Sequence, residues 1–585
     1  MIVKHVKIIL MKFNWKIGGE AGFGIMTSGL EIAKVATRSG YHTFDYSEYP
    51  SLIRGGHNTY EVVISNDSVS APKWEIDMLV CLNKDTFELH KDRLHLGSVI
   101  LYDPEDFQPD STSILIPIPF KAFKKECNID QKMVNSIALG ASLALLGGEL
   151  KVFETIIRDE FGKKGEAIVK ENVELAKKGY DYILKEHCPL KQILQKKKGE
   201  RQMVVTGNDA FSLGVIGADC RYYAAYPMTP SSSVLGTLAA LQYQTGMVVR
   251  HPEDEISVVN SAIGAAFAGA RAAVGTSGGG FALMNEALSY AGVAEIGFVL
   301  FLAMRSGPAT GMPTWTEQGD LLFATFAGHG EFPKIVLAPG DPEEMITLTL
   351  KAFDLADIYQ TPVILLSDKF LSESHTSLPE DRVLKLLKTH KIDRGKIVAK
   401  TKQGSEYLRY KNEPDGISEQ LIPGQEGIFY QANSYEHLED SHTTESGVER
   451  IKQVNKRDKK RQTYLKKHFA EPTFYGDPKA DTVFISWGSN KGPILEAMKI
   501  LAEKFKRGFG YVHFTHLYPL DEEKIKDFMN VKYNHRRILI ENNSHAQFGS
   551  LLRMQTGIDI KEKWLKYDGR PWWPEEIVQR LTNKS

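Results

Sequence analysis

Two segments place chemically useful side chains directly after apolar, strand-like runs. The segment Tyr226-Pro227-Met228-Thr229-Pro230 follows the run YYAA, and Arg305 follows GFVLFLAM. Parallel sheets of α/β proteins bind ligands at the carboxyl ends of their strands, so we expect Thr229 to face a crevice. The planar guanidinium of Arg305 matches a carboxylate through paired hydrogen bonds, and its burial is costly without such a partner. The sequence therefore predicts a carboxylate near Arg305, either within the protein or on a ligand.

The proline-containing turn also has a simpler interpretation. Pro227 and Pro230 fix the backbone after a strand, and the serines at positions 231–233 are typical caps of a helix that follows. A rigid turn with a capped helix needs no ligand. Both interpretations stay open at this point.

Acidic residues open the next helix-like segment. His251 to Ser257 includes Glu255, and acids at a helix start ordinarily complement the helix dipole. The segment from Val258 to Ala273 is rich in glycine and alanine, which predicts a helix that another element can approach closely. The run from Gly275 to Gly280 is either a flexible turn or a loop that passes close to a bulky ligand.

A glycine-rich loop lies near the N-terminus. Gly18 to Gly24 follows a short apolar run and precedes a helix-like stretch from Thr27 to Arg38, and Asp45 ends the next strand-like run. Backbone amides at such a turn can hold a phosphate, and an acid beyond the glycines can hold a ribose. Because Thr27 occupies the place of the third glycine, an ordinary strand-to-helix turn is the alternative. In the next loop, Arg54 is a candidate to meet an anion.

No metal site is predicted. The four cysteines have no CxxC or CxxH spacing, and the segment from His437 to His442 has irregular loop spacing that predicts no ligand geometry. His329, in AGHGEF, either lines the crevice near Arg305 or is an ordinary loop histidine.

The elements that position these residues alternate between strand-like and helix-like patterns. This alternation predicts an α/β fold with mostly parallel sheets. Composition shifts place boundaries that give segments at 13–195, 203–380, 381–475 and 476–585. The basic run VNKRDKKRQTYLKKHF, near the end of the polar third segment, predicts a solvated helix.

Composition excludes several classes of protein. The 585 residues carry 72 Lys plus Arg and 73 Asp plus Glu, so the net charge of -1 gives no general attraction to nucleic acid or an anionic membrane. The most apolar stretches are shorter than the ~20 residues of a membrane span. The opening segment is a poor signal peptide. We therefore expect a cytoplasmic protein.

The order of the motifs carries more information than any one motif. AYPMTPSSS, EDEIS, GTSGGG, MRSGPATGMPT and LAPGDPEE resemble the alpha subunit of 2-oxoacid:ferredoxin oxidoreductases, with Met228 in place of the isoleucine of its YPITP element. GGEAGFG and YPSLIRGG resemble the gamma part of the same enzymes, here fused to the N-terminus. Downstream, RYKNEPDGIS, IPG, NSYEHLED, WGSNKGP, YPL and ENNSHAQFGSLLR extend the resemblance over nearly the whole chain.

The resemblance implies three α/β domains and a thiamine diphosphate enzyme. The domains would be a gamma-type domain (13–195), a thiamine diphosphate pyrimidine-binding-type domain (203–380) and a transketolase C-terminal-like domain (476–585), with an extended linker region at 381–475. Glu255 would hydrogen-bond N1′ of the aminopyrimidine, and Arg305 would hold the oxoacid carboxylate. Thr229 would face substrate and cofactor on a cofactor-binding turn formed by Tyr226, Pro227, Thr229 and Pro230.

The same resemblance implies partners. Family enzymes keep the diphosphate and Mg²⁺ site and the cysteines of a [4Fe-4S] cluster on a beta subunit, and this chain has neither a GDG motif nor a cysteine cluster. We expect the chain to form half of an active site, with a beta subunit as partner in a heterotetramer, coenzyme A as co-substrate and ferredoxin as electron acceptor.

Alternatives remain for both the substrate and the function. The fused gamma-alpha layout resembles 2-oxoglutarate enzymes more than pyruvate ones, so we expect CoA-dependent oxidative decarboxylation of 2-oxoglutarate, with pyruvate or another 2-oxoacid as the alternative. A nucleotide-binding dehydrogenase or regulatory module, built on Gly18 to Gly24 and Asp45, is the rival from another class. An inactive structural subunit is the third possibility.

Overall fold

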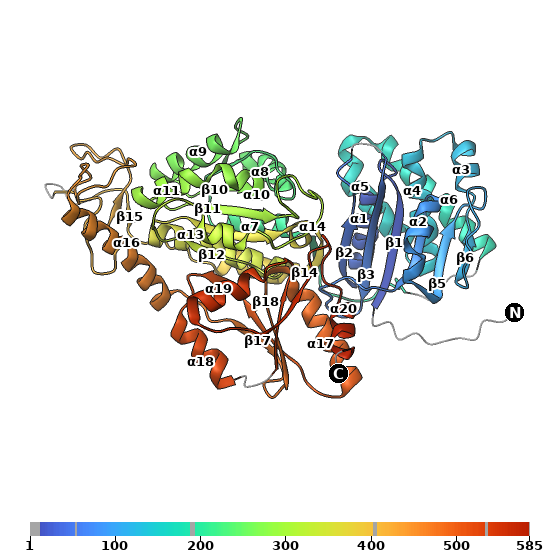
Figure 1. Cartoon of the computed structure of the whole chain (residues 1–585). Coiled ribbons are helices and arrows are strands. Elements are labelled where there is room, and N and C mark those ends of the chain that lie inside the picture. The colour runs from blue at the N-terminus through green and yellow to red at the C-terminus, as the bar shows by residue number, and fades with distance from the viewer. Residues whose placement is uncertain (1–11, 53–54, 188–192, 402–405, 533–535, 584–585) are drawn as a thin grey trace. The chain divides into compact units, whose positions relative to one another are not determined.

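The chain forms two compact units in the computed structural model, which describes residues 12–52, 55–187, 193–401, 406–532 and 536–583. The first unit comprises Met1–Val205, Ser374–Leu384 and Trp573–Ser585, and the second comprises Thr206–Glu373 and Lys385–Trp572 (Figure 1). Arg54, the candidate anion contact, lies outside the described residues. No helix within the described ranges is long and apolar enough to cross a membrane.

An eight-stranded sheet forms the centre of the first unit, in the order β6-β5-β4-β1-β3-β2-β14-β7. Its strands are β1 (Lys12–Glu20), β2 (His42–Glu48), β3 (His57–Ser65), β4 (Ile76–Cys81), β5 (Leu94–Tyr102), β6 (Ile114–Pro117), β7 (Gln202–Val205) and β14 (Thr376–Pro379). The prediction of a mostly parallel sheet is wrong here, because β1 pairs parallel with β4 but antiparallel with β3. β2 and β3 are joined by one short loop, which makes them an antiparallel pair.

Helices cover this sheet and bury its apolar residues. They are α1 (Ile25–Arg38), α2 (Lys84–His90), α3 (Phe120–Cys127), α4 (Val134–Leu146), α5 (Leu150–Phe161), α6 (Glu166–Glu186) and α20 (Pro574–Thr582). The helix predicted at Thr27 to Arg38 is confirmed as α1. Every residue of α4 is buried, and glycines let it approach α6 closely, because a Cβ on Gly140 would overlap the carbonyl oxygen of Ala176.

A seven-stranded sheet forms the centre of the second unit, in the order β20-β12-β13-β11-β10-β8-β9. Its strands are β8 (Tyr222–Ala225), β9 (Val248–Arg250), β10 (Ala272–Thr276), β11 (Val299–Met304), β12 (Ile335–Leu337), β13 (Val363–Asp368) and β20 (His516–Tyr518). All neighbours pair in parallel except β12 and β20. The carboxyl ends of β8, β10 and β11 therefore lie side by side, as a doubly wound sheet requires.

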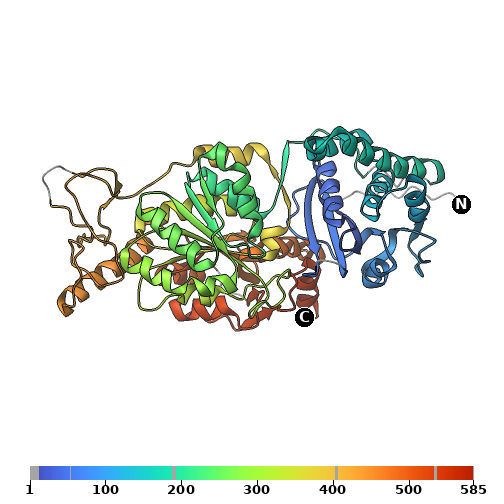
Figure 2. The same ribbon diagram turned by 90° about the horizontal axis from the view of Figure 1, so that it is seen from above.

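Helices lie on both faces of this sheet (Figure 2). They are α7 (Gly207–Gly217), α8 (Ser232–Thr245), α9 (Glu255–Phe267), α10 (Gly278–Leu283), α11 (Asn285–Ala294), α12 (Leu321–Phe326), α13 (Pro342–Tyr359) and α14 (Lys369–Glu373), and α15 (Glu380–Thr389) follows them. The helix predicted over Val258 to Ala273 is wrong at its end. Gly269 has a φ of 92°, a conformation that favours glycine, so α9 stops and the chain enters β10.

A five-stranded sheet completes the second unit, in the order β17-β19-β18-β21-β22. Its strands are β17 (Thr473–Gly476), β18 (Thr482–Trp487), β19 (Gly510–Phe514), β21 (Arg536–Glu541) and β22 (Glu562–Leu565), with helices α17 (Lys491–Phe505), α18 (Glu522–Lys532) and α19 (Gln547–Thr556). β20 lies in this part of the sequence but pairs with β12, which joins the two sheets. These three main sheets confirm the predicted α/β fold class.

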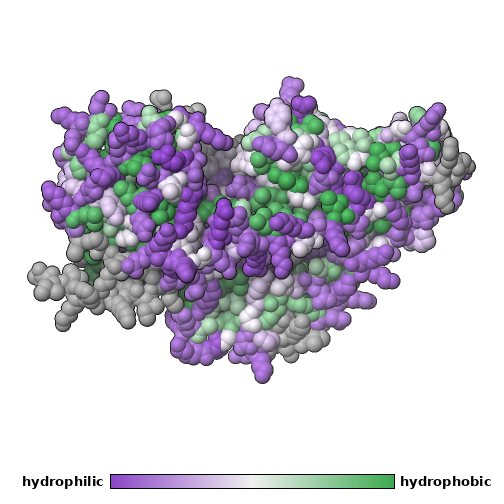
Figure 3. Space-filling view, turned by 180° about the vertical axis from the view of Figure 1, so that it is seen from behind, coloured by the Kyte–Doolittle hydropathy of each residue, from purple (hydrophilic) through white to green (hydrophobic). Residues whose placement is uncertain are grey.

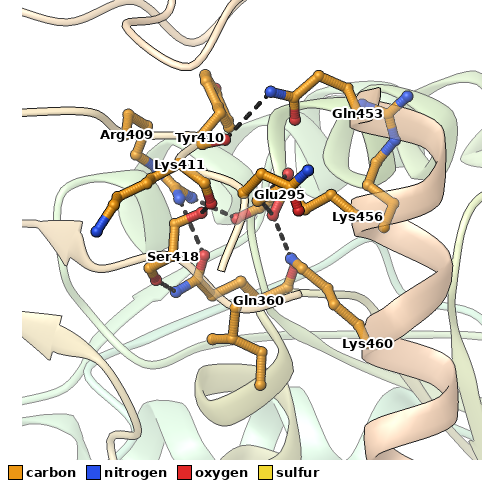
Figure 4. Close-up of polar contacts among 12 residues, drawn as sticks. Glu295, Gln360, Arg409, Tyr410, Lys411, Ser418, Gln453, Lys456 and Lys460 are labelled. Atoms are coloured by element: carbon orange, nitrogen blue, oxygen red, sulfur yellow. Dashed lines mark hydrogen bonds and ion pairs between the residues drawn. The ribbon is translucent and has the colours of Figure 1, made fainter. Parts of the chain in front are cut away.

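The part of the sequence that links the seven-stranded sheet to the five-stranded sheet contains the short strands β15 (Ile397–Val398) and β16 (Gln420–Leu421) and the long helix α16 (Gly447–Lys467). The prediction of a solvated basic helix is wrong for one face of α16. Lys456 and Lys460 are buried, and both form ion pairs with Glu295 at the end of α11 (Figure 4). A buried carboxylate thus compensates charges that the sequence pattern alone places in water.

Candidate active site

The turn after β8 is held by side chains of two helices. The amide of Asn208, on α7, donates to the carbonyl oxygen of Pro230 at 2.7 Å and to Ser233 Oγ at 2.8 Å. Ser231 Oγ donates to the carbonyl oxygen of Met228 at 2.8 Å and makes no cap bond to α8, so the predicted capping role is wrong for Ser231. These hydrogen bonds make the turn rigid. Because Thr229 is half-buried and Tyr226 is 39% exposed, the turn is also open to ligands.

Glu255 is the first residue of α9 and is almost fully buried, at 4% exposure. Helix capping is done by its neighbour Asp254, which accepts from Ser257 N at 2.7 Å. Among the described residues, Glu255 Oε1 has no hydrogen-bond partner. A buried carboxylate oxygen without a partner costs free energy, and a nitrogen ligand that shares a proton with it removes that cost. The geometry therefore favours the ligand role over the dipole role.

The glycines of the run after β10 let the site close around this carboxylate. A Cβ on Gly280 would overlap Glu255 Oε1 and Thr276 Oγ1, and a Cβ on Gly278 would lie 2.5 Å from Asp320 Oδ2. The backbone nitrogen of Gly280 also donates to Met228 Sδ at 3.3 Å. Both predictions for this run, a flexible turn or a loop, are wrong: Gly275 and Thr276 end β10, and Gly278 to Gly280 form the first turn of α10.

Arg305 lies at the carboxyl end of β11 beside the same turn. Its Nη1 donates to the carbonyl oxygen of Thr229 at 2.9 Å, and within the described ranges no carboxylate forms an ion pair with it. Burial lowers the pKa of Arg305, and the nearby Asp320 opposes that effect. The guanidinium thus retains donors that no carboxylate of the described residues engages.

Two acidic residues near Arg305 were missed by the sequence reasoning. Burial raises the pKa of Asp320 to about 6, with Arg305 opposing the shift, and burial together with Asp320 raises the pKa of Glu317. Both acids precede α12 in the segment TEQGD, which has no feature that distinguishes it from a surface loop. Only the packing of Asp320 on Gly278 shows that this residue lies beside the candidate site.

A turn from the five-stranded sheet braces the loop that follows Arg305. Gly569, with a φ of 80°, accepts from Thr316 N at 3.0 Å, and a Cβ there would lie 2.8 Å from Met312 Cε. The guanidinium of Arg570 lies 3.8 Å from the centre of the Trp315 ring. Its Asp-Gly-Arg-Pro composition is a turn signal in the sequence, but nothing in the sequence places this turn beside the loop after Arg305.

The other candidate residues lie elsewhere. His329 lines a separate cavity of about 220 Å³ with Tyr290, Arg450 and Arg457. The ring of His437 stacks on Tyr410, and no group of three potential metal ligands occurs in the described part of the chain.

The glycine-rich loop of the first unit is an ordinary turn between β1 and α1. Gly22 and Gly24 have φ values of 95° and 75°. Asp45 is 1% exposed and accepts hydrogen bonds from Tyr60 Oη at 2.5 Å and from the backbone nitrogen of His375 at 2.6 Å. Because both carboxylate oxygens are engaged and buried, Asp45 cannot hold a ribose, which removes the main support for the dehydrogenase interpretation.

Two family models match the sequence. "Pyruvate ferredoxin/flavodoxin oxidoreductase" matches residues 14–182, and "Pyruvate flavodoxin/ferredoxin oxidoreductase, thiamine diP-bdg" matches residues 213–456. The second match includes the turn at Thr229, Glu255 and Arg305.

Similar proteins extend over almost the full length. A 2-oxoacid:ferredoxin oxidoreductase subunit alpha from Sulfolobus sp is 31% identical, over 98% of this chain and 96% of the relative. The 2-oxoglutarate synthase subunit KorA from Methanothermobacter marburgensis is 28% identical, over 64% of this chain and 97% of its own length. The solved 2-oxoglutarate:ferredoxin oxidoreductase from Magnetococcus marinus, with 2-oxoglutarate, coenzyme A and succinyl-CoA bound, is 29% identical with a TM-score of 0.89, over 98% of this chain and 99% of that chain.

Proposed function

The chain belongs to the family of 2-oxoacid:ferredoxin oxidoreductase alpha subunits, and on this premise we propose that it uses 2-oxoglutarate and completes its active site with a separate beta subunit. It is part of an oxidoreductase with an iron-sulfur protein as electron acceptor. The reaction converts a 2-oxoacid and coenzyme A into acyl-CoA, CO₂, one proton and two electrons. The dehydrogenase alternative is set aside.

The unpartnered oxygen of Glu255 is the observation that supports the cofactor assignment. Thiamine diphosphate, when bound, supplies the nucleophilic carbon and the electron sink that decarboxylation needs. Glu255 Oε1 is buried, unpartnered and flanked by the bare backbone of Gly280, so it fits a flat ring nitrogen that shares a proton with it. Glu255 would hold that proton and fix the ring, while the turn at Tyr226, Pro227, Thr229 and Pro230 would line the cofactor.

Arg305 would bind and orient the substrate. Its bond to the Thr229 carbonyl fixes one nitrogen, and its remaining donors can take the 2-oxoacid carboxylate. Thr229, on the same turn, would then lie between the substrate and the ring held by Glu255. Holding both reactants in one orientation is worth several kcal/mol of the barrier.

The beta subunit is proposed from the exposed surface around the site. On α8, α9 and α10, the side chains of Tyr243, Ile256 and Leu283 are between 50% and 91% exposed, and Gly264 of α9 is also exposed. Figure 3 shows that hydrophobic residues gather in patches among hydrophilic ones on one face of the molecule. Exposed apolar side chains next to small residues suit a close protein interface.

We assign the remaining components to the assembled enzyme. The beta subunit would carry the [4Fe-4S] cluster and the Mg²⁺ that binds the diphosphate. Ferredoxin would accept the electrons, and two copies of each chain would form a heterotetramer in the cytoplasm.

The proposed domains are the gamma-type domain (13–195), the pyrimidine-binding domain (203–380), the linker region (381–475) and the transketolase C-terminal-like domain (476–585).

The substrate assignment is supported by the names of similar proteins. The KorA relatives and the Magnetococcus enzyme act on 2-oxoglutarate by their names, whereas the family models are described by pyruvate. Pyruvate is therefore the second candidate. A dicarboxylate needs another cation besides Arg305, which the beta subunit would supply.

Anaerobic reduction of a viologen dye tests this proposal. The chain is assayed alone and with its beta subunit, with coenzyme A and either 2-oxoglutarate or pyruvate. We expect dye reduction only in the mixture, only with coenzyme A, and faster with 2-oxoglutarate. Activity of the chain alone would refute the shared active site, and preference for pyruvate would overturn the substrate assignment. Nicotinamide binding by an inactive mixture would revive the dehydrogenase interpretation.

A further inference from the structure

Asp320 has no role in the mechanism above, although it packs against the same glycine run as Glu255. It is the residue before α12, and its carboxylate makes no cap bond to that helix. Instead, Oδ2 is so close to the backbone of Gly278 that a Cβ there would lie 2.5 Å from it. Two residues further along, Gly280 makes the same close approach to Glu255. The carboxylates of Asp320 and Glu255 therefore both pack against the same glycine run.

Asp320 and Arg305 influence each other without direct contact. Each shifts the pKa of the other, but within the part of the chain that the structure describes they form no ion pair of 4.0 Å or less. Asp320 therefore supplies a negative charge near the guanidinium and leaves its hydrogen-bond donors available. Within the described residues, the charged groups whose pKa values Asp320 shifts are Arg305, at the end of β11, and Glu317, in its own loop.

A substrate carboxylate that binds Arg305 brings a second negative charge into the same partly buried space. Like charges that share such a site favour protonation of one of them. We infer that Asp320 takes up one proton from solvent when a 2-oxoacid carboxylate binds Arg305, and returns it when that carboxylate leaves as CO₂. Asp320 is then a positioning residue that balances the charge of the substrate clamp. This inference rests on the proposed function.

The inference predicts how binding of the 2-oxoacid carboxylate changes with pH. Burial raises the pKa of Asp320 to about 6 in the chain without substrate. At pH 5.5 the side chain is mostly neutral and the carboxylate binds without proton uptake. Above pH 6 the ionised form predominates, so binding has to recruit a proton and weakens as the pH rises. We expect kcat/KM for the 2-oxoacid to fall by on the order of tenfold between pH 6 and pH 8.

Kinetics of the reconstituted alpha-beta complex test the inference. Initial rates are measured from pH 5.5 to 8 with saturating coenzyme A, for the unchanged chain, for Asp320→Asn and for Glu317→Gln as the matched acid in the same loop. Asp320→Asn imitates the protonated form, so its KM at pH 7.5 should be lower than that of the unchanged chain, on the order of tenfold, and nearly independent of pH. Glu317→Gln should keep the unchanged pH dependence.

Calorimetry provides a test that needs no variant. Oxalylglycine, an unreactive analogue of 2-oxoglutarate, is titrated into the unchanged complex at pH 7 in two buffers of different ionisation enthalpy. An uptake of between about half and one proton per site is expected, and zero uptake would overturn the inference. If the unchanged complex is inactive with every 2-oxoacid, the proposed function fails. If it is active and Asp320→Asn keeps the pH dependence, only the role of Asp320 fails.

Discussion

The buried carboxylate of Glu295 pairs with two buried lysines of helix α16, and a third buried cation, Arg409, binds the backbone of the same glutamate. Glu295, Arg409, Lys456 and Lys460 are each no more than 1% exposed. Lys456 Nζ lies 2.6 and 2.7 Å from the two carboxylate oxygens, Lys460 Nζ lies 2.5 Å from one of them, and Arg409 donates to the Glu295 carbonyl oxygen at 2.7 Å (Figure 4). The cluster carries a surplus of positive charge when both lysines are ionised.

The pKa values of the two lysines show how strongly the fold disfavours their charged forms. Burial lowers the pKa of Lys460 from 10.5 to about 7 and that of Lys456 to about 8, although Glu295 opposes both shifts. Burial alone would raise the pKa of Glu295, but Lys456, Lys460 and Arg409 hold it well below its usual range. A lowering of about 3.5 at 1.36 kcal/mol per pKa unit means that the fold disfavours charged Lys460 by about 5 kcal/mol.

We predict opposite effects for two substitutions. Glu295→Gln leaves three buried cations without their carboxylate and should destabilise α16 by about 3–5 kcal/mol. Lys460→Met removes one surplus cation and keeps the bidentate pair with Lys456, so local stability at pH 7 should stay unchanged or rise. The folded pKa of Lys460 lies below its unfolded value, so the unfolded chain binds more protons between pH 7 and 10.5. Stability should therefore rise with pH in that window, and Lys460→Met should reduce this rise to the part that Lys456 contributes.

Hydrogen exchange of peptides that cover α16 measures these effects locally. Glu295→Gln should exchange about 100-fold faster or more at pH 7, and Lys460→Met should exchange no faster than the unchanged chain. The reasoning is refuted if Lys460→Met accelerates exchange as much as Glu295→Gln does, because Lys460 would then contribute net stability rather than a surplus charge.

Three further predictions concern the site and the first unit. Glu255→Gln should lower kcat of the assembled enzyme by about 10²–10⁴ with an unchanged thermal midpoint, because Oε1 has no partner within the described chain; full activity would exclude its proton-sharing role. Arg305→Lys should raise KM for the 2-oxoacid by about tenfold with little change in KM for coenzyme A, because a lysine loses the paired geometry; equal rises in both values would contradict a substrate clamp. Gly140→Ala should destabilise the first unit by about 1–3 kcal/mol in thermal unfolding, since its Cβ overlaps Ala176, whereas Gly162→Ala, with open space around it, should be tolerated.

The sequence predicted the family and the candidate site motifs, because these depend on residues that are contiguous. The turn at Thr229, the helix start at Glu255 and the strand end at Arg305 were each found from a few neighbouring residues. Their order along the chain led to the same family as the comparisons with known proteins. The α/β fold class followed from the alternation of strands and helices, which is also a local property.

Tertiary structure decided the features that depend on residues far apart in sequence. Asp320 and the turn at Gly569 belong to the site only because the fold brings them to Gly278 and Met312. The basic face of α16 is buried only because Glu295, 161 residues from Lys456, compensates its charge. Charge patterns and single acids do not reveal such partners, because the free energy of a buried ion depends on its whole environment and not on its neighbours in sequence.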